Sequence, residues 1–172
     1  MIPKGMFFSL LNYCIEIFGN VWGLDVYDDK DRKSTAFTKD DNRKLQVIMN
    51  NVLRSLTGLD RDTSVTTLHS ASGLLSVHQR CAFYTLTSVH KAVKHQHPAY
   101  SYSMFKPNSA TVQNSGASRV NYELSISRGS YFYRGSRLYN KLPDSLQQSA
   151  NQSTFKKEAK KWVIRNIPVL PP

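Results

Sequence analysis

The feature that most constrains this chain is the recurrence of apolar side chains every three or four residues in several separate segments. It is clearest between residues 40 and 58, where one helical stripe holds Leu45, Ile48, Met49, Val52, Leu53 and Leu56. We expect Asp40 or Asp41 to cap this helix and Gly58 to end it. An amphipathic helix of this length is stabilised mainly by packing, so the pattern predicts several helices around one core.

The same spacing predicts further helices on both sides of this one. A first helix ends at Gly19, and its apolar face holds Phe7, Leu10, Leu11, Cys14, Ile15 and Phe18. A short helix is expected within residues 63–72, and the longest over 75–95 with Ser76 as its cap. A last helix runs from a Ser153 cap to Pro168, with an inner face of Phe155, Ala159, Trp162 and Val163.

Two segments are predicted to form strands. Tyr122, Leu124 and Ile126 alternate with polar residues, and residues 131–133 are consecutive aromatics that would pair with them across 127–130. Residues 99–118 read as a loop or a disordered segment. The predicted fold is mainly α, a single small helical domain with a short antiparallel β-hairpin near the C-terminal third. It divides into an apolar helix (1–19), a charged loop (20–39) and a helical and hairpin region (40–168).

The charge is uneven along the 172 residues. The formal net charge is +11. Residues 1–73 carry nine basic and nine acidic side chains, whereas residues 74–172 carry fourteen basic and three acidic ones. A basic half of this kind indicates a polyanionic partner, either nucleic acid or an anionic membrane surface. The alternative is a solvated basic surface without a partner.

Residues 128–143 combine aromatic and basic side chains. Gly129 and Gly135 bracket the aromatic run, and each is expected at a turn or at a point of close backbone approach. Aromatic rings can stack on bases while Lys and Arg neutralise phosphates. A second basic group lies on the outward face of the last helix. The predicted nucleic-acid-binding residues are Arg128, Tyr131, Tyr133, Arg134, Arg137, Lys156, Lys157, Lys160, Lys161 and Arg165. The alternative places the aromatic run partly in the core.

Four short blocks, in order, resemble the end of the reverse transcriptase of non-LTR (LINE or jockey-like) retrotransposons. Residues 12–19 read NYCIEIFG, similar to the family's YGIEIWG, and residues 73–80 read GLLSVHQR, similar to GWLSVxQR. Residues 130–143 resemble its aromatic-Arg-Gly run followed by Leu, an aromatic, Asn and Leu-Pro. Residues 153–157 resemble its closing helix. The resemblance implies the segment after the polymerase core, here as a truncated or domesticated fragment. It also implies that residues 1–19 pack on that core or on another protein.

No catalytic or metal site is expected. Asp28 and Asp29 follow Tyr27 directly, one place out of register with the polymerase carboxylate pair, and no third aspartate lies in a credible strand upstream. The five histidines are interpreted as surface or half-buried residues rather than ligands. Cys14 and Cys81 are expected to be buried free thiols. We expect no cofactor.

Residues 6–18 are too short and too polar to span a membrane. A cytoplasmic or nuclear protein is expected, which would not synthesise DNA alone. The leading hypothesis is non-specific binding of RNA or DNA through the basic half. The alternatives are a protein-interaction module that docks through its apolar N-terminal helix, and a non-functional relic of a decayed element.

Overall fold

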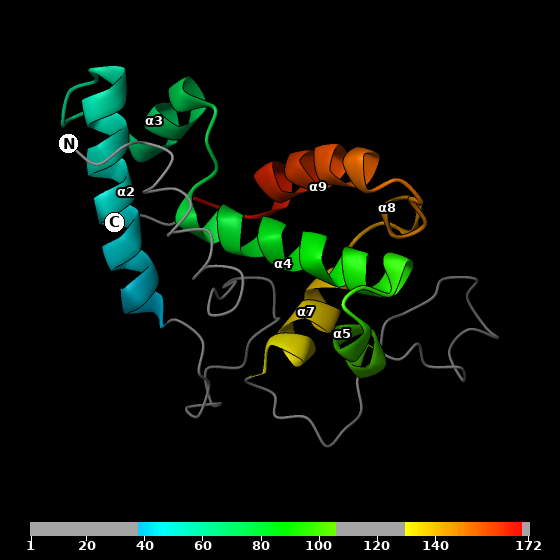
Figure 1. Cartoon of the computed structure of the whole chain (residues 1–172). Helices are drawn as coiled ribbons and strands as arrows, with labels where there is room; N and C mark the ends of the chain where they lie inside the picture. The colour runs from blue at the N-terminus through cyan, green and yellow to red at the C-terminus, as the bar shows by residue number, and fades with distance from the viewer. Residues whose placement is uncertain (1–37, 106–129, 170–172) are drawn as a thin grey trace.

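The structure is a computed structural model that describes residues 38–105 and 130–169. Every regular element in this part of the chain is a helix (Figure 1). In chain order the helices are α2 (Lys39–Thr57), α3 (Val65–Ser72), α4 (Val77–His95), α5 (Ala99–Met104), α7 (Tyr131–Tyr139), α8 (Asp144–Gln147) and α9 (Gln152–Asn166). The predicted helices 40–58, 63–72 and 75–95 are therefore confirmed within a few residues at each end. The expected helix 1–19 and residues 20–37 of the expected loop 20–39 lie outside the described residues. The end of that predicted loop is wrong, because α2 begins at Lys39 with Thr38 as its cap.

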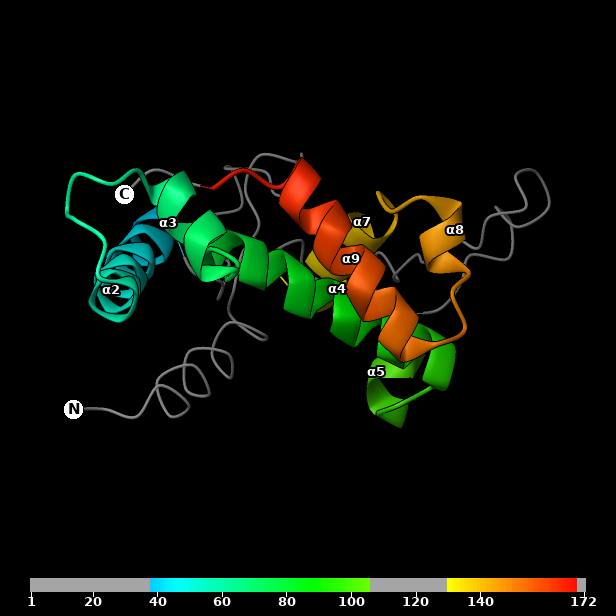
Figure 2. The same cartoon turned by 90° about the horizontal axis from the view of Figure 1, so that it is seen from above.

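Helix α4 is the centre of the fold, because α2, α5, α7 and α9 all pack against it. Figures 1 and 2 show α9 and α7 on opposite sides of α4, while α2 crosses near its N-terminal end. Helix α3 packs mainly on α2, and α8 on α9. The shared core is made by Val77, Cys81, Ala82, Leu86, Val89 and Ala92 of α4, Phe155, Ala159 and Val163 of α9, and Leu138 and Tyr139 of α7.

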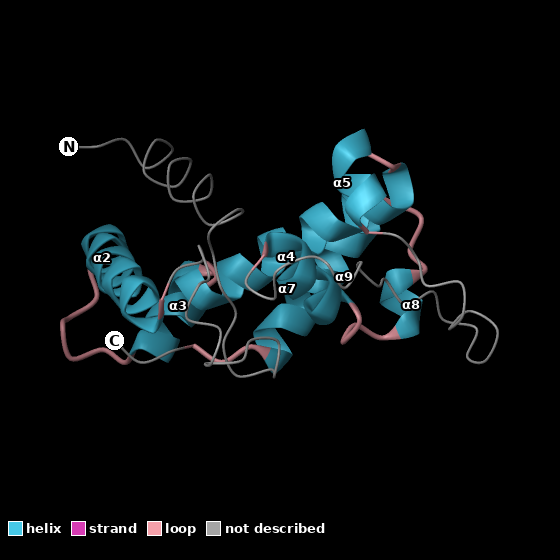
Figure 3. Ribbon diagram, turned by 90° about the horizontal axis from the view of Figure 1, so that it is seen from below, coloured by secondary structure: helices cyan, strands magenta, loops and turns pink. Residues whose placement is uncertain are grey.

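The predicted β-hairpin is wrong. The described residues contain no strand (Figure 3), and the aromatic residues 131–133 form the first turn of α7. Ser130 caps that helix by accepting a hydrogen bond from the backbone N–H of Tyr133 at 3.2 Å. The helix then buries Leu138 and Tyr139 against the core. Burial of this face outweighs the weak β-preference of three aromatics. Residues 122–126 lie outside the described part of the chain.

Helix ends follow local hydrogen-bonding rules, although two caps differ from the predicted ones. Thr38, rather than Asp40 or Asp41, caps α2, and the Asp41 carboxylate completes a capping box. Asn151, rather than Ser153, caps α9. Ser76 caps α4 in a second capping box, and Gly58 ends α2 in the left-handed conformation at φ 69°, both as predicted.

The segment after α4 was expected to be irregular from residue 99 onward, which is wrong for residues 99–104. These residues form α5, and Phe105 directly after it is fully buried. The Phe105 ring packs edge-on against Tyr131 and Phe132 of α7, with centroids 6.4 and 5.2 Å away. Long-range aromatic contacts of this kind leave no periodic signal in a serine- and tyrosine-rich stretch.

The predicted apolar stripe of α2 is only partly buried. Met49 and Leu53 lie in the core, but Ile48 and Leu56 are 49% and 38% exposed. The buried face instead includes three polar side chains, Asn42, Gln46 and Asn50.

Gln46 is the centre of the polar contacts beneath α2, and its side chain satisfies all of its polar atoms. Its Oε1 accepts a hydrogen bond from the backbone N–H of Val77 at 2.8 Å. Its Nε2 donates to Asn50 Oδ1 at 2.7 Å and to His69 Nε2 at 2.8 Å. One amide thereby joins α2, α3 and the first residue of α4.

Gly135 lies inside α7 at a point of close helix approach, one of its two predicted roles. A Cβ atom built there would lie 2.8 Å from Val89 Cγ2, and real Cβ atoms essentially never show such a contact. Val89 is fully buried and β-branched, so it has little freedom to rotate away. The missing side chain therefore sets the distance between α7 and α4.

We expect Gly135→Ala to lower the free energy of unfolding by about 1–3 kcal/mol through overpacking. Alanine is the better helix former by roughly 1 kcal/mol, so a net loss can come only from the contact. Urea unfolding would measure it. In a Val89→Ala background the same change should be neutral or stabilising; an equal loss in both backgrounds would contradict the close-approach interpretation.

We expect Gln46→Leu to cost about 2–3 kcal/mol, because it leaves the Val77 N–H and the Asn50 and His69 acceptors buried without their partner. Asn51→Leu changes an exposed amide on the same helix and should stay within about 0.5 kcal/mol of the parent. Thermal or urea unfolding compares the two. Equal stabilities of the two variants would show that the Gln46 contacts contribute nothing measurable.

Candidate nucleic-acid interface

The outward face of α9 carries the largest group of the predicted binding residues. Phe155, Ala159 and Val163 are spaced four residues apart and are completely buried against the core, which turns the opposite side of the helix to solvent. Exposed side chains on that side are Lys156, Lys157, Lys160, Lys161 and Arg165. The structure thus brings five of the ten predicted residues together on one helix.

Intramolecular contacts engage these cations only weakly. Lys161 Nζ forms an ion pair with Glu158 at 2.8 Å, and both side chains are largely exposed. Exposed helical pairs at i,i+3 contribute about 0.2–0.5 kcal/mol and are screened by salt. Lys160 Nζ lies 3.5 Å from the Gly73 carbonyl oxygen. Arg165 lies in the last turn of α9, where the helix dipole favours a positive charge. None of these contacts withdraws a cation from solvent.

The predicted residues of α7 are placed differently from those of α9. Tyr131 is half-buried against the core, and Arg134 is only 6% exposed, so its guanidinium lies inside the fold. Tyr133 and Arg137 form a partly exposed pair, with the guanidinium carbon 5.7 Å from the ring centroid and Nη1 donating to the tyrosine hydroxyl at 3.1 Å. Arg128 lies outside the described residues.

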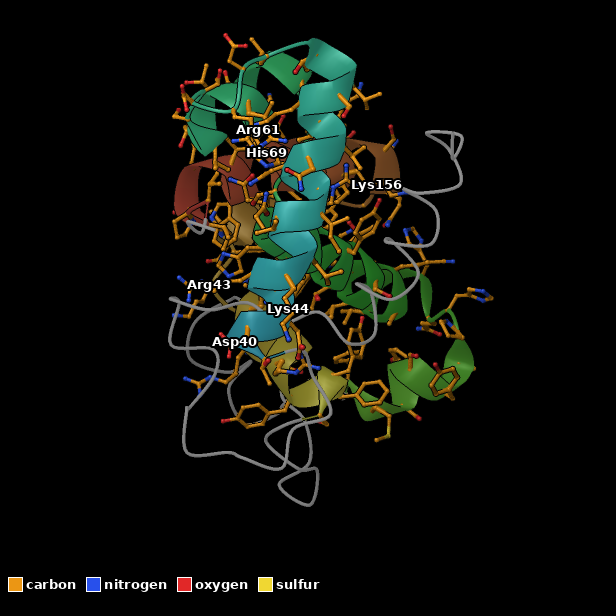
Figure 4. The ribbon with its side chains drawn as sticks, turned by 90° about the vertical axis from the view of Figure 1, so that its left-hand side faces the viewer. Asp40, Arg43, Lys44, Arg61, His69 and Lys156 are labelled. Carbon is orange, nitrogen blue, oxygen red and sulfur yellow. The ribbon has the colours of Figure 1, made fainter. Side chains whose placement is uncertain are left out.

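The ten predicted residues therefore do not form one surface. Helices α7 and α9 pack on opposite sides of α4 (Figures 1 and 2), so the Tyr133–Arg137 pair is separated from the α9 cations. Other exposed cations are scattered. Figure 4 shows Arg43 and Lys44 near one end of α2 and Arg61 near the other, apart from Lys156. Lys91 and Lys94 of α4 are exposed as well, and α9 carries the largest group of exposed cations on one described helix.

Three of the histidines are buried, so their interpretation as surface or half-buried residues is wrong. His69, His78 and His90 are at most 5% exposed. His78 Nδ1 lies 3.1 Å from the Pro168 carbonyl oxygen. His69 Nδ1 donates to the Leu74 carbonyl at 2.9 Å while its Nε2 accepts from Gln46. That pattern requires the neutral ring, and burial lowers the pKa of His69 below its ordinary value.

His90 and Tyr139 are the two strongly perturbed titratable groups of the core. Its ring stacks on Phe155 at a centroid distance of 3.7 Å and an interplanar angle of 3°. Its Nδ1 lies 3.0 Å from the Tyr139 hydroxyl, which donates to the Gln147 carbonyl at 3.3 Å. Burial, followed by the charges of Lys94 and His95, lowers the pKa of His90 to about 4. Burial also raises the pKa of the Tyr139 hydroxyl. Both groups are neutral at physiological pH.

A pocket of about 420 Å³ is lined by residues of α3, of the segment after it and of α9. Its apolar lining comes from Leu74, Leu75, Ile164 and Val169. Lys160 also lines the pocket. Within residues 38–105 and 130–169, no three His, Cys, Asp or Glu side chains are grouped closely enough to hold a metal ion. In the same part of the chain, no helix has the length and hydropathy needed to cross a membrane.

Comparisons with protein-family models, with curated protein sequences and with solved structures found no match to this chain.

We expect the fold to lose stability as the pH falls from 6.5 towards 4. The folded chain holds His90 with a lowered pKa, so it binds fewer protons than the unfolded chain over this range. The stabilisation is complete above the unfolded pKa and disappears progressively below it. One pKa unit corresponds to about 1.4 kcal/mol, so His90 alone would account for roughly 3 kcal/mol.

Urea unfolding at a series of pH values would measure this loss. His90→Leu should flatten the dependence between pH 6.5 and 4, and His97→Ala, which changes an exposed histidine, should leave it as in the parent chain. An unchanged pH dependence in His90→Leu would assign the effect to another group.

Proposed function

We propose that this protein binds RNA or DNA without sequence preference, through the basic face of α9. The observation that carries the proposal is the exposure of Lys156, Lys157, Lys160, Lys161 and Arg165 on one helix, with Glu158 as the one carboxylate beside them on that helix. Clustered cations on one face are the electrostatic footprint of a nucleic-acid-binding protein. The concentration of positive charge in the C-terminal half agrees with it.

The dimensions of the basic face suit a phosphate backbone. Residues 156 and 165 are nine positions apart, about 14 Å along a helix axis. A strand of duplex DNA places a phosphate about every 3.4 Å along its axis, so the face can reach several phosphates. Flexible lysines dominate it, and lysine neutralises phosphate as a point charge rather than through a fixed planar geometry.

The aromatic residues do not extend this surface. Tyr133 is paired with Arg137 on α7, across α4 from the lysines. Contacts to phosphate carry no base information, and binding through α9 alone is therefore independent of sequence.

The resemblance to the end of a retrotransposon reverse transcriptase supports the same activity, because that segment follows a polymerase that handles RNA and DNA. We propose that the chain is a non-catalytic fragment of this kind. Such a protein would act in the cytoplasm or the nucleus, where nucleic acid is available.

We expect the double variant Lys157→Ala/Lys161→Ala to weaken binding equally for every sequence tested. Each phosphate contact contributes about −0.9 to the slope of log affinity against log salt on duplex DNA, so the slope should flatten by roughly two units. Fluorescence anisotropy with labelled duplexes between 50 and 200 mM salt, conditions of the kind over which such binding changes steeply, would measure both quantities.

Lys91→Ala/Lys94→Ala is the matched control, since it removes two exposed positive charges from α4 and leaves α9 intact. Circular dichroism should show unchanged helix content in both variants, because alanine is the better helix former. If the α4 and α9 variants flatten the slope equally, the protein binds through its overall charge and the proposed interface on α9 is wrong.

A further inference from the structure

The apolar and the buried faces of α2 do not coincide. The buried polar residues Asn42, Gln46 and Asn50 lie on one side of the helix. Leu45, Ile48, Val52 and Leu56 lie on another, rotated by about a third of a turn at 3.6 residues per turn. Ile48 and Leu56 are 49% and 38% exposed, whereas Leu45 and Val52 are partly covered. These four residues are called the open stripe of α2.

The open stripe has the form of a helix-packing surface rather than of scattered apolar residues. Its members recur at intervals of three and four residues, and the stripe runs over more than three turns. Helices α3 and α4 pack on α2, and Leu45 at the start of the stripe contacts the hydrophobic core, whereas Ile48 and Leu56 remain exposed. Val47, the remaining exposed apolar residue of α2, is 42% exposed and lies outside the stripe.

The chain itself carries a segment complementary to this surface. Phe7, Leu10, Leu11, Cys14, Ile15 and Phe18 follow the same three- and four-residue spacing, and the helical arrangement of residues 7–18 would place them on one face. Residues 19–37 connect this segment to Thr38. At about 3.3 Å per extended residue these nineteen residues span up to roughly 60 Å, far more than the length of α2.

A short tether also favours this segment over a partner in solution. Linking two binding surfaces by a flexible chain gives an effective concentration in the millimolar range. A second copy of the protein would have to be present at a comparable concentration to compete. The apolar residues of the segment recur at the i, i+3, i+4 and i+7 spacing by which an amphipathic helix lays its apolar face on an apolar surface.

We propose that residues 7–18 dock as an amphipathic helix on the open stripe of α2 in the same molecule. The interaction would bury Ile48 and Leu56 and extend the apolar core along α2. It concerns α2 and not α9, so it is independent of the proposed nucleic-acid binding.

The protein contains its own reporter for this contact. Cys14 lies on the apolar face of the docking segment, and Cys81 is completely buried in α4. A thiol reagent such as Ellman's reagent, applied to the full chain, would therefore report undocking through Cys14 and global unfolding through Cys81. A Cys14→Ser chain supplies the rate of Cys81 alone.

Ile48→Asp and Val47→Asp form a matched pair, because they place the same charge at adjacent, similarly exposed, β-branched positions of α2. We expect slow labelling of Cys14 in the parent chain. Labelling should be about tenfold faster or more in Ile48→Asp, since opening of the contact controls access to a covered thiol. Val47→Asp should label at the parent rate, with Cys81 protected throughout. Ile48→Ser and Val47→Ser give a milder pair, to be compared if Ile48→Asp exposes Cys81.

Three results would overturn the proposal. Rapid labelling of Cys14 in the parent chain would show that the segment is undocked and free for a partner protein. Equal labelling rates of Cys14 in the Ile48 and Val47 variants, both as slow as in the parent chain, would show that the segment docks on another surface. Labelling of Cys14 that becomes slower as the protein concentration rises would show that the segment docks on a second copy of the protein.

Discussion

The fold depends on the burial of α4 among four other helices. A helix covered on most of its circumference must satisfy its polar side chains inside the protein, because an unpaired buried polar group costs roughly 1–3 kcal/mol. Arg80 Nε donates to the Leu75 carbonyl and Gln79 Nε2 to the Ile167 carbonyl, at 3.1 and 3.0 Å. His78 and His90 contact the Pro168 carbonyl and the Tyr139 hydroxyl. Most of these contacts join α4 to distant parts of the chain. The polar groups of α4 therefore help to determine which segments pack against it.

The same contacts orient α9 and so determine which of its residues face solvent. Gln79 and His78 hold the carbonyl groups just beyond its C-terminal end, and the stack of Phe155 on His90 fixes its N-terminal turn. With both ends fixed, the helix cannot rotate about its axis without breaking a buried contact. Its lysines are therefore presented outward by interactions made on the opposite side. The basic face is therefore a consequence of how α4 and α9 are packed.

Periodicity and capping chemistry predicted the long helices, because both act within a few residues along the chain. The outward lysines of α9 followed from the same periodicity. Features set by distant contacts were not predictable in this way. Three adjacent aromatics at the start of α7 have a weak local preference for a strand, and their helix is selected by the burial of Leu138 and Tyr139. The burial of Arg134 and His90 has no local signal either, since it depends on helices far away in the sequence. On α2, the Gln46 contacts with Val77 and His69 decide which side faces the core, and the apolar pattern alone pointed to another side.

The positions of the aromatic residues explain why the proposed interface would recognise the charge of a nucleic acid and not its base sequence. Stacking on bases requires exposed rings, and several large rings in the basic half are not available for it. Tyr139, Phe155 and Phe105 are fully buried, and Tyr133 already carries the guanidinium of Arg137. Along α9 the exposed apolar residue is Ile164, at 52%, which has no ring to stack. Trp162 of α9 is partly buried against the core, and the exposed Tyr100, at 69%, lies on α5. The outward face of α9 therefore carries cations without a fully exposed ring, and a surface of that composition can recognise the phosphate backbone that all nucleic acids share.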